Sequence, residues 1–155
     1  MGDNMYLKNY LEQFDKKIKL FVDMDGVIAD YDVGKPIDYE EKRPLFTSIN
    51  KLEEISKMNN VELYILSITR YSEGIEQKNN WLDRFAPFFI KENRIIISKE
   101  ENKDKTSPEL KAEYLKKLKK DNYVIVLIDD DPRILKKVNE ICEDVYLLKD
   151  TVLVD

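Results

Sequence analysis

Residues 18–27 of the chain read IKLFVDMDGV, a short apolar run that stops at two aspartates and a glycine. The run is rich in β-branched and aromatic residues and is too short for a helix, so it predicts a buried β-strand. Asp23 and Asp25 follow at once, and open α/β sheets bind their ligands just beyond the carboxyl ends of the strands. Gly26 allows the positive φ or close backbone approach that a tight turn needs. The stretch therefore predicts a ligand-binding site at the carboxyl end of this strand.

An Asp-x-Asp pair alone is also typical of a solvated turn, but two further apolar runs of this chain end in polar residues. They are Ser67 and Thr69 after residues 61–66, and Asp129 and Asp130 after residues 123–128. The carboxyl ends of parallel strands meet at one edge of a sheet, so these groups are expected to converge with Asp23. Two carboxylates about 4 Å apart repel by roughly 4 kcal/mol at an effective dielectric near 20. The cluster therefore predicts a Mg²⁺ site, and acidic loops splayed into solvent are the alternative.

The composition excludes several classes of protein. At 155 residues the chain is expected to form one domain, residues 1–155. Its net charge of −5 argues against general nucleic-acid binding, although a metal and local lysines can still attract an anionic substrate. The absence of histidine excludes Ser-His-Asp and Cys-His catalysis and His-based zinc sites. The single cysteine, Cys142, is expected in the core and fits a reducing, cytoplasmic compartment. With no signal-peptide pattern and no apolar run of membrane length, no membrane partner is expected.

Strands that alternate with helices indicate a parallel sheet covered on both faces. The sequence predicts strands at about 18–22, 61–66, 94–97, 123–128 and 144–148, and helices at about 5–14, 47–58, 72–85, 107–118 and 132–142. The second helix is expected to be capped by Thr47 or Ser48. Ser107 and Asp131 are predicted N-caps, because a proline follows each of them. Residues 29–43 show no periodicity and are predicted to be irregular.

The order of Asp-x-Asp, Ser and Asp-Asp along these strand ends resembles the haloacid-dehalogenase-like phosphatases, a superfamily of Mg²⁺-dependent phosphoryl-transfer enzymes. The resemblance implies a three-layer Rossmann-like α/β domain, a five-stranded parallel sheet in the order 3-2-1-4-5, and a minimal cap at about 29–43. The stretch from Phe21 to Arg133 is most similar to the 5′-nucleotidase type C group, the 5′(3′)-deoxyribonucleotidases. The matching segments are VDMDGVIAD at 22–30, KNNWL at 78–82 and LIDD at 127–130. The implied substrate is a small phosphorylated molecule, such as a nucleotide.

The resemblance also implies roles for the residues at the strand ends. Asp23 would attack phosphorus and become an aspartyl phosphate. Asp25 would be the general acid for the leaving oxygen and then the base for water, and its backbone carbonyl would face the metal. The Ser67 hydroxyl would bind phosphoryl oxygens, with a helix-capping role as the alternative. Asp130 would be a direct ligand of Mg²⁺. Asp129 would contact the ion through a water molecule or would contact the groups that bind it.

The lysine that balances the charge of the phosphoaspartate is ambiguous, because Lys103, Lys105 and Lys111 all precede the fourth strand. The stretch KTSPEL, which begins at Lys105, is most like the Lys-Pro-x-Pro-Glu-hydrophobic pattern of the family. Lys105 is therefore preferred, and Lys103 is the alternative. In the loop after the second strand, Thr69 and Arg70 are weaker candidates for substrate binding, Arg70 because its guanidinium fork suits anions.

The sequence leaves other functions open beside a Mg²⁺-dependent phosphomonoester hydrolase. A receiver domain would carry its phosphoacceptor after the third strand, where residues 95–98 contain no aspartate. The chain could also be a catalytically silent binding module with this fold, but the intact Asp23 and Asp25 argue against that interpretation. A nucleic-acid end phosphatase agrees with the small cap, but the acidic net charge weakens it. The identity of the phosphomonoester, and whether two copies pair as a homodimer, also stay open.

Overall fold

The five strands of the sheet are all parallel and lie in the order β3-β2-β1-β4-β5, which confirms the predicted fold class and strand order. The computed structural model describes residues 6–31, 38–119 and 121–154. The strands are β1 (Lys17–Val22), β2 (Val61–Thr69), β3 (Arg94–Ser98), β4 (Tyr123–Asp129) and β5 (Val145–Lys149). Because β1 has a partner on each side, the residues that follow it emerge near the middle of the carboxyl edge.

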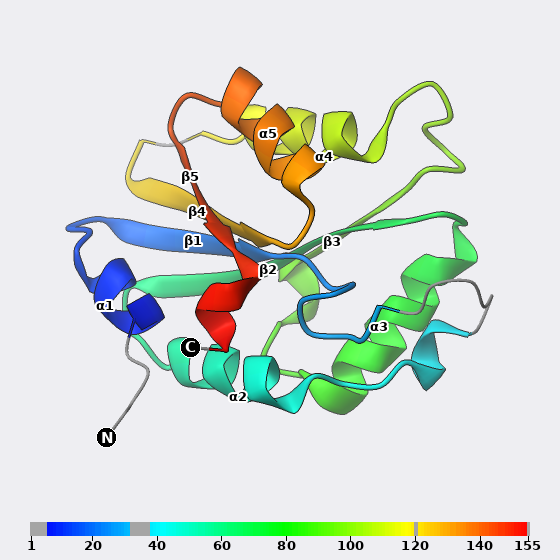
Figure 1. Cartoon of the computed structure of the whole chain (residues 1–155), viewed down its shortest axis with the longest axis horizontal. Coiled ribbons are helices and arrows are strands. Elements are labelled where there is room, and N and C mark those ends of the chain that lie inside the picture. Colours follow the sequence, from blue (N-terminus) through cyan, green and yellow to red (C-terminus); the bar gives the residue numbers. More distant parts are fainter. Residues whose placement is uncertain (1–5, 32–37, 120, 155) are drawn as a thin grey trace.

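Helices cover both faces of the sheet, which gives the expected three layers. They are α1 (Tyr6–Glu12), α2 (Phe46–Ile55), α3 (Glu73–Phe85), α4 (Ser107–Lys116) and α5 (Pro132–Ile141), with short 3-10 segments η1 (Tyr39–Glu41), η2 (Lys91–Asn93) and η3 (Asp150–Leu153). Figure 1 shows α4 and α5 on one face and α1, α2 and α3 on the other. Met5, the predicted start of the first helix, lies outside the described residues. Within the described ranges, no helix has both the length and the apolar character needed to cross a membrane.

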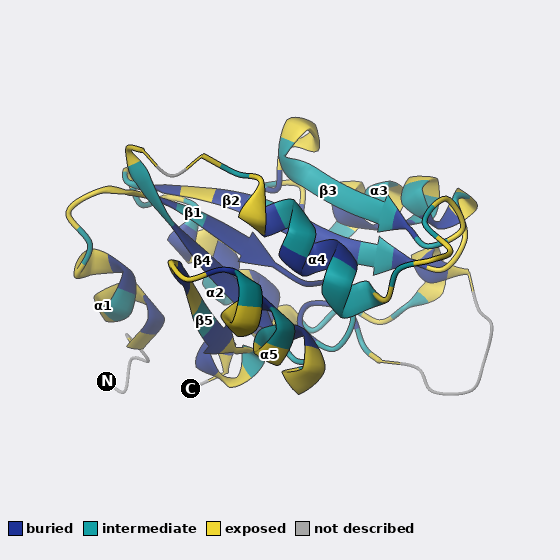
Figure 2. Ribbon diagram, turned by 90° about the horizontal axis from the view of Figure 1, so that it is seen from above, coloured by how far each residue is buried: buried dark blue, intermediate teal, exposed yellow. Residues whose placement is uncertain are grey.

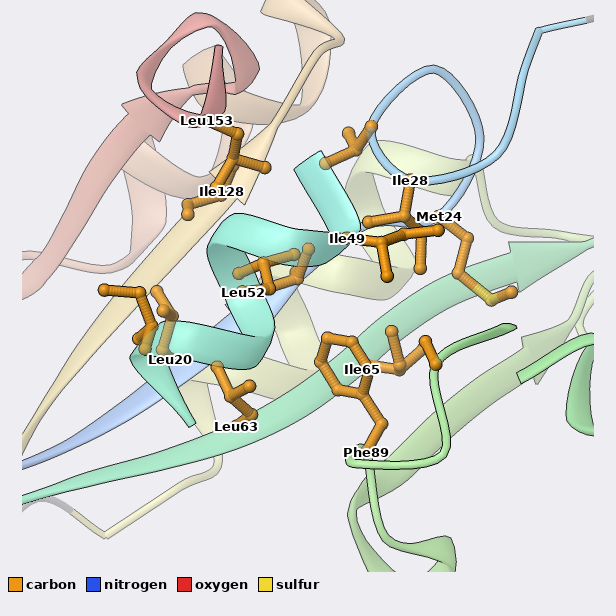
Figure 3. Close-up of a cluster of buried hydrophobic side chains, with 14 of the residues drawn as sticks. Leu20, Met24, Ile28, Ile49, Leu52, Leu63, Ile65, Phe89, Ile128 and Leu153 are labelled. Carbon is orange, nitrogen blue, oxygen red and sulfur yellow. The ribbon is translucent and has the colours of Figure 1, made fainter. Parts of the chain in front are cut away.

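Each face of the sheet carries its own hydrophobic cluster, because successive strand residues point to opposite faces. Phe21 and Leu127 pack with residues of α4 and α5, whereas Leu20 packs with residues of α1, α2 and α3. Figure 2 shows the central strands buried from both sides. In Figure 3, Ile49 and Leu52 of α2 lie among the side chains of the cluster that contains Leu20. Burial on both faces explains why the strands read as continuous apolar runs.

Two helices begin earlier than their sequence signals predict. For α4, the N-cap is Thr106 and not Ser107. The Thr106 hydroxyl accepts a hydrogen bond from the Glu109 amide at 3.3 Å, and the Glu109 carboxylate accepts one from the Thr106 amide at 3.0 Å. This reciprocal capping box satisfies two helix-end donors at once and outcompetes the Ser-Pro signal. Asp131 caps α5 as predicted, and it accepts from the Arg133 amide at 2.9 Å.

The predicted cap of α2 at Thr47 or Ser48 is also displaced. The helix begins at Phe46, no side chain caps its first turn, and Ser48 is buried inside it. The ring of Phe46 packs edge-on against Phe85 of α3, with the two ring centroids 6.3 Å apart. Packing against α3 therefore replaces the capping hydrogen bond at this helix start.

Of the cap-like insertion predicted at 29–43, the structure describes residues 29–31 and 38–43, and residues 32–37 lie outside the described ranges. Its two ends lie side by side, since the amide of Asp30 donates to the carbonyl of Arg43 at 2.9 Å. The η1 segment of the insertion packs directly against α3. The insertion thus returns to the sheet edge beside the end of β1.

Candidate active site

Asp23 continues the line of β1 at the carboxyl edge of the sheet. Its amide donates to the carbonyl of Ile128 in β4 at 3.1 Å, and its side chain is only 10% exposed. The chain then turns sharply at Gly26, which has a φ of 80°. A Cβ at Gly26 would lie 2.1 Å from Oδ2 of Asp130. Glycine is therefore required here both for the conformation and for the close approach of Asp130, as the sequence predicts.

Lys111 of α4 joins the ends of β1 and β4. Its ammonium donates to Oδ1 of Asp23 at 2.9 Å and to Oδ2 of Asp129 at 2.7 Å, and its side chain is 1% exposed. Burial alone would lower the pKa of Lys111, but the carboxylates of Asp23 and Asp129 outweigh burial and hold the pKa above its usual value. Asp129 also accepts from the amide of Asp131 at 3.0 Å. A permanently charged lysine thus fixes two carboxylates at the centre of the site.

Asp23, Asp129 and Asp130 form an oxygen cluster that could hold a metal ion. One carboxylate oxygen from each lies within 4.8 Å of the others. Burial raises the pKa of Asp23 to about 6, and burial together with Asp23 raises the pKa of Asp130 to about 6. Clustered, buried carboxylates of this kind suit a hard cation such as Mg²⁺, which prefers oxygen ligands and relieves their repulsion. The side chain of Asp25, whose backbone carbonyl is the group expected to face the metal, is not among the clustered carboxylates.

Asp25 instead lies between two lysines that the sequence analysis did not select. Lys42 donates to its Oδ1 at 2.7 Å, and Lys78 approaches its Oδ2 at 3.3 Å. Burial would raise the pKa of Asp25, but Lys78 and Lys42 outweigh burial and hold the pKa below its usual value. Asp25 therefore carries a negative charge that these two ammonium groups balance, separately from the Lys111 pair.

Lys78 is also the partner of Ser67. Its ammonium donates to Oγ of Ser67 at 2.6 Å and to the carbonyl of Ile68 at 2.8 Å. Both side chains are buried, and Ser67 has no exposed surface. Burial lowers the pKa of Lys78, against the opposing pull of Asp25 and Asp23. Ser67, predicted to face the phosphoryl group, thus orients the ammonium that lies beside Asp25.

The predicted lysine, Lys105, is not at the site, and Lys111 takes the place expected for it. Lys105 pairs with Glu113 at 2.6 Å, and its side chain is 38% exposed. It precedes the N-cap Thr106, so it lies before the helix face that covers the site. The alternative, Lys103, is exposed and lines a separate pocket with Arg70 and Tyr71. The structure therefore does not bring Lys105 or the alternative, Lys103, to Asp23.

Asp23 opens into a cavity of about 390 Å³ whose lining includes Asp25, Lys111, Asp130 and Tyr31. The cavity is large enough for the phosphate and the adjoining part of a small substrate.

The other two predicted binding residues, Thr69 and Arg70, line a neighbouring pocket of about 490 Å³ together with Tyr39. Within that pocket, the Thr69 hydroxyl donates to the carbonyl of Tyr71 at 3.2 Å. The structure therefore does not bring Thr69 or Arg70 to the cavity that contains Asp23.

Comparisons with solved structures identify the fold. No protein-family model and no curated protein matches the chain. A chain of the Pnkp1/Rnl/Hen1 complex aligns with a TM-score of 0.67 and 12% identity, over 87% of this chain and 46% of that one. A second structure, of the Pnkp1/Rnl/Hen1 RNA repair complex, aligns at 0.64 and 14% identity over 92% and 52%. The present chain thus spans about half the length of those chains.

The class C acid phosphatase from Bacillus anthracis with tungstate bound also aligns, with a TM-score of 0.57 and 17% identity, over 94% of this chain and 72% of that one. At these identities the likeness concerns the fold. The chain therefore shares the α/β fold of these structures, with a five-stranded parallel sheet in the order β3-β2-β1-β4-β5.

Proposed function

We propose that the chain is a Mg²⁺-dependent phosphatase that hydrolyses phosphomonoesters through an aspartyl phosphate on Asp23. The observation that carries the proposal is the contact of the Lys111 ammonium with Oδ1 of Asp23, inside a carboxylate cluster that lines a cavity. A nucleophilic carboxylate held at contact distance from a buried ammonium is arranged to receive an anionic phosphoryl group. Among the structures of similar fold, two are of a class C acid phosphatase, which supports the proposal.

Each residue has a defined part in the proposed reaction. A carboxylate oxygen of Asp23 attacks phosphorus, and the bond to the leaving oxygen breaks. Asp25 protonates that oxygen and later takes a proton from the water that hydrolyses the aspartyl phosphate. In the free protein Lys42 and Lys78 hold Asp25 ionised, so Asp25 must take up a proton together with the substrate before it can act as the acid, and the ionised form that remains afterwards is the one that accepts a proton from water. Mg²⁺ held by Asp23, Asp129 and Asp130 would supply positive charge against the phosphoryl oxygens.

Two substrate classes are candidates for the proposed phosphatase. A nucleoside monophosphate follows from the similarity to the 5′-nucleotidase type C group and agrees with the net charge of −5. A phosphorylated end of a nucleic acid is the second candidate, because a structure of the same fold belongs to a complex named for RNA repair. The substrate panel below separates the two classes.

The expected result of the central experiment is phosphate release that requires Mg²⁺. The purified chain is assayed with nucleoside 5′- and 3′-monophosphates, sugar phosphates and 5′- or 3′-phosphorylated oligonucleotides. EDTA should abolish release, and added Mg²⁺ should restore it, because in the described part of the chain Lys111 is the only residue that forms an ion pair with these three carboxylates, which leaves them unable to meet a phosphate dianion. An EDTA-insensitive rate would contradict the metal requirement. No turnover of any substrate would leave the binding module as the better interpretation.

Metal binding has a readout that does not depend on activity. Mg²⁺ should raise the thermal midpoint of the chain, because a ligand that binds only the folded state stabilises it. Asp130→Asn should remove most of this rise, since it takes one carboxylate from the cluster. Asp38→Asn is a matched control, because Asp38 is exposed, caps η1 and is not one of the three clustered carboxylates. An unchanged Mg²⁺ response in Asp130→Asn would exclude Asp130 as a ligand.

We also expect Lys78 and Ser67 to act as one unit. Lys78→Met keeps the apolar stem and removes the ammonium beside Asp25, so kcat should fall by about 10², the usual cost of a lost preorganised donor. Ser67→Ala removes an acceptor that holds this ammonium. The rate of the double variant should then match that of Lys78→Met within a few-fold. If the two losses multiply instead, Ser67 acts on the substrate independently of Lys78.

A further inference from the structure

Three pockets follow one another along the carboxyl edge of the sheet. The first is the cavity that contains Asp23, and Ile68 of β2 contributes to its lining. The next residue of β2, Thr69, lines the second pocket together with Arg70 and Tyr71. Arg70 and Tyr71 also line a third pocket, of about 390 Å³. Each pocket therefore meets the next at shared or consecutive residues, in a row that starts at Asp23.

The third pocket is dominated by cationic side chains. Its lining consists of Arg70, Tyr71, Lys99, Glu100 and Lys103. Among the described residues, no ion pair involves Arg70, Lys99 or Lys103. The Glu100 carboxylate accepts from the amide of Ser72 at 3.4 Å. The ring of Tyr71 is 52% exposed, and the Arg70 guanidinium lies 5.8 Å from its centroid. The pocket thus offers unpaired positive charge beside an exposed aromatic ring.

The loop after β3, which carries two of these cations, is held by hydrogen bonds. The amide of Lys99 donates to the carbonyl of Thr69 at 2.9 Å, and its carbonyl accepts from the Asn102 amide at 3.0 Å. Ser98 is 3% exposed, and its hydroxyl lies 3.1 Å from that of Ser72, the N-cap of α3. The Asn102 side chain donates to the carbonyl of Ser98 at 2.8 Å. The loop is therefore fixed to the end of β2 and the start of α3 before any ligand binds.

The order of the pockets indicates what the third one binds. Because β3 lies two strands from β1, the third pocket is removed from Asp23 by roughly 10 Å, which one phosphate group does not span. The middle pocket carries hydrogen-bonding side chains, among them Asp38, Thr69 and Gln77, which suit a sugar and a base. The cations beyond it suit a second phosphate. Phosphate, nucleoside and phosphate is the order of groups along a nucleic acid strand.

We propose that the third pocket is a subsite for a single-stranded nucleic acid whose terminal phosphate lies at Asp23. This inference rests on the proposed function and selects the second of its two substrate classes. Arg70, Lys99 and Lys103 bind the phosphodiester that follows the terminal nucleotide, and Tyr71 stacks on a base. The net charge of −5 does not prevent this contact, because charges beyond about 10 Å are largely screened at physiological salt.

Lys99→Gln combined with Lys103→Gln removes two of the three cations without breaking an ion pair. Both changes are made in the Asp23→Asn chain, so that binding is measured without turnover. The Kd for an end-phosphorylated single-stranded oligonucleotide, measured by fluorescence anisotropy with Mg²⁺, should rise roughly 20-fold near 0.1 M salt. The slope of log Kd against log salt should become shallower by about 1.4, because each phosphate contact on a single strand contributes about 0.7.

The matched control is Lys91→Gln combined with Lys136→Gln. It makes the same change in net charge at two exposed lysines that lie outside the row of pockets. Neither the Kd nor its salt dependence should change. Equal effects of the two double variants would show that the oligonucleotide responds only to net charge, and would overturn the subsite.

Turnover separates a strand from a small molecule with two phosphates. In the chain with Asp23 intact, Tyr71→Ala should lower kcat/KM about tenfold for the phosphorylated oligonucleotide, because a stacked base is lost. A nucleoside 3′,5′-bisphosphate has no following base, so Tyr71→Ala should leave its kcat/KM unchanged. If wild type prefers the bisphosphate to the oligonucleotide, or both lose equally, the third pocket serves a small molecule and the proposed strand is wrong.

The assay with p-nitrophenyl phosphate distinguishes failure of this inference from failure of the proposed function. If the wild-type chain releases phosphate from no substrate, p-nitrophenyl phosphate included, the proposed function fails and this inference fails with it. If p-nitrophenyl phosphate is hydrolysed while the Lys99 and Lys103 changes leave binding and turnover of the oligonucleotide unaltered, the inference alone is overturned.

Discussion

Replacing Asp23 with asparagine is expected to reduce phosphate release by at least about 10⁴-fold while the fold is retained. An amide cannot attack phosphorus. Residues that act together with a nucleophile contribute little to the rate once that nucleophile is lost. Asparagine still offers a carbonyl oxygen to Lys111, which keeps its second partner, Asp129, at 2.7 Å. The thermal midpoint should therefore stay close to that of the wild type. Phosphate release and the midpoint are measured on the same preparation.

Asp25→Asn is the matched comparison, because it removes a carboxylate two residues away without removing the nucleophile. With p-nitrophenyl phosphate, a burst of p-nitrophenolate should be followed by a slow steady state, because no base then activates water. Mass spectrometry of the intact protein should detect phosphate on Asp23 in this variant and not in Asp23→Asn. Phosphorylation of the Asp23→Asn chain, or a rate above about a hundredth of wild type, would assign the nucleophile to another residue.

The fold and the acidic centre could be predicted from the sequence because both depend on local signals. Apolar runs of strand length, each ending in polar residues, gave the strands, and their ends meet at one edge of the sheet for geometric reasons. Asp23, Asp129 and Asp130 therefore converge as predicted, within 4.8 Å of one another. The need for Gly26 is also local, since its φ of 80° follows from the turn itself.

Of the two buried lysines, Lys111 was one of three candidates but was not preferred, and Lys78 was not selected, although the helices carry a signal for each. Lys111 lies four residues before the buried Leu115, and Lys78 lies four residues before the buried Leu82. Residues four apart share one face of a helix, so both lysines occupy positions of an apolar stripe. A lysine there must find a carboxylate or leave a charge buried. The family pattern drew attention to Lys105 instead, in the loop before the helix.

Tyr39 and Lys42 carried no such signal. They belong to a segment without periodicity, and their position depends on tertiary contacts with Trp81 and Gln77 of α3. Capping and turn preferences act over a few residues and do not report which helix a loop will meet. The part of the site that surrounds Asp25 could therefore be found only from the structure.

Lys111→Met is expected to lower kcat by about 10²–10³, the cost of removing one preorganised donor from a developing charge. The ammonium lies between Asp23 and Asp129, where a phosphoaspartate would add further negative charge beside two buried carboxylates. The phosphoenzyme should suffer most, so the loss should appear in kcat rather than in KM. Lys105→Met, the residue that the sequence pattern favoured, should stay within a few-fold of wild type because Lys105 pairs with Glu113 at a partly exposed position.

Stability must be measured beside the rate, because breaking a buried ion pair from one side costs about 3–5 kcal/mol. Mg²⁺ should recover part of the lost thermal midpoint of Lys111→Met by taking over the charge of the clustered carboxylates, but it should not recover the rate. Lys111→Arg is the second variant: it keeps the charge in a larger group, so it should be more stable than Lys111→Met and still slow. If Lys111→Met folds and retains the wild-type rate while Lys105→Met loses activity, Lys105 is the lysine that balances the charge of the phosphoaspartate. The assignment of Lys111 would then be overturned.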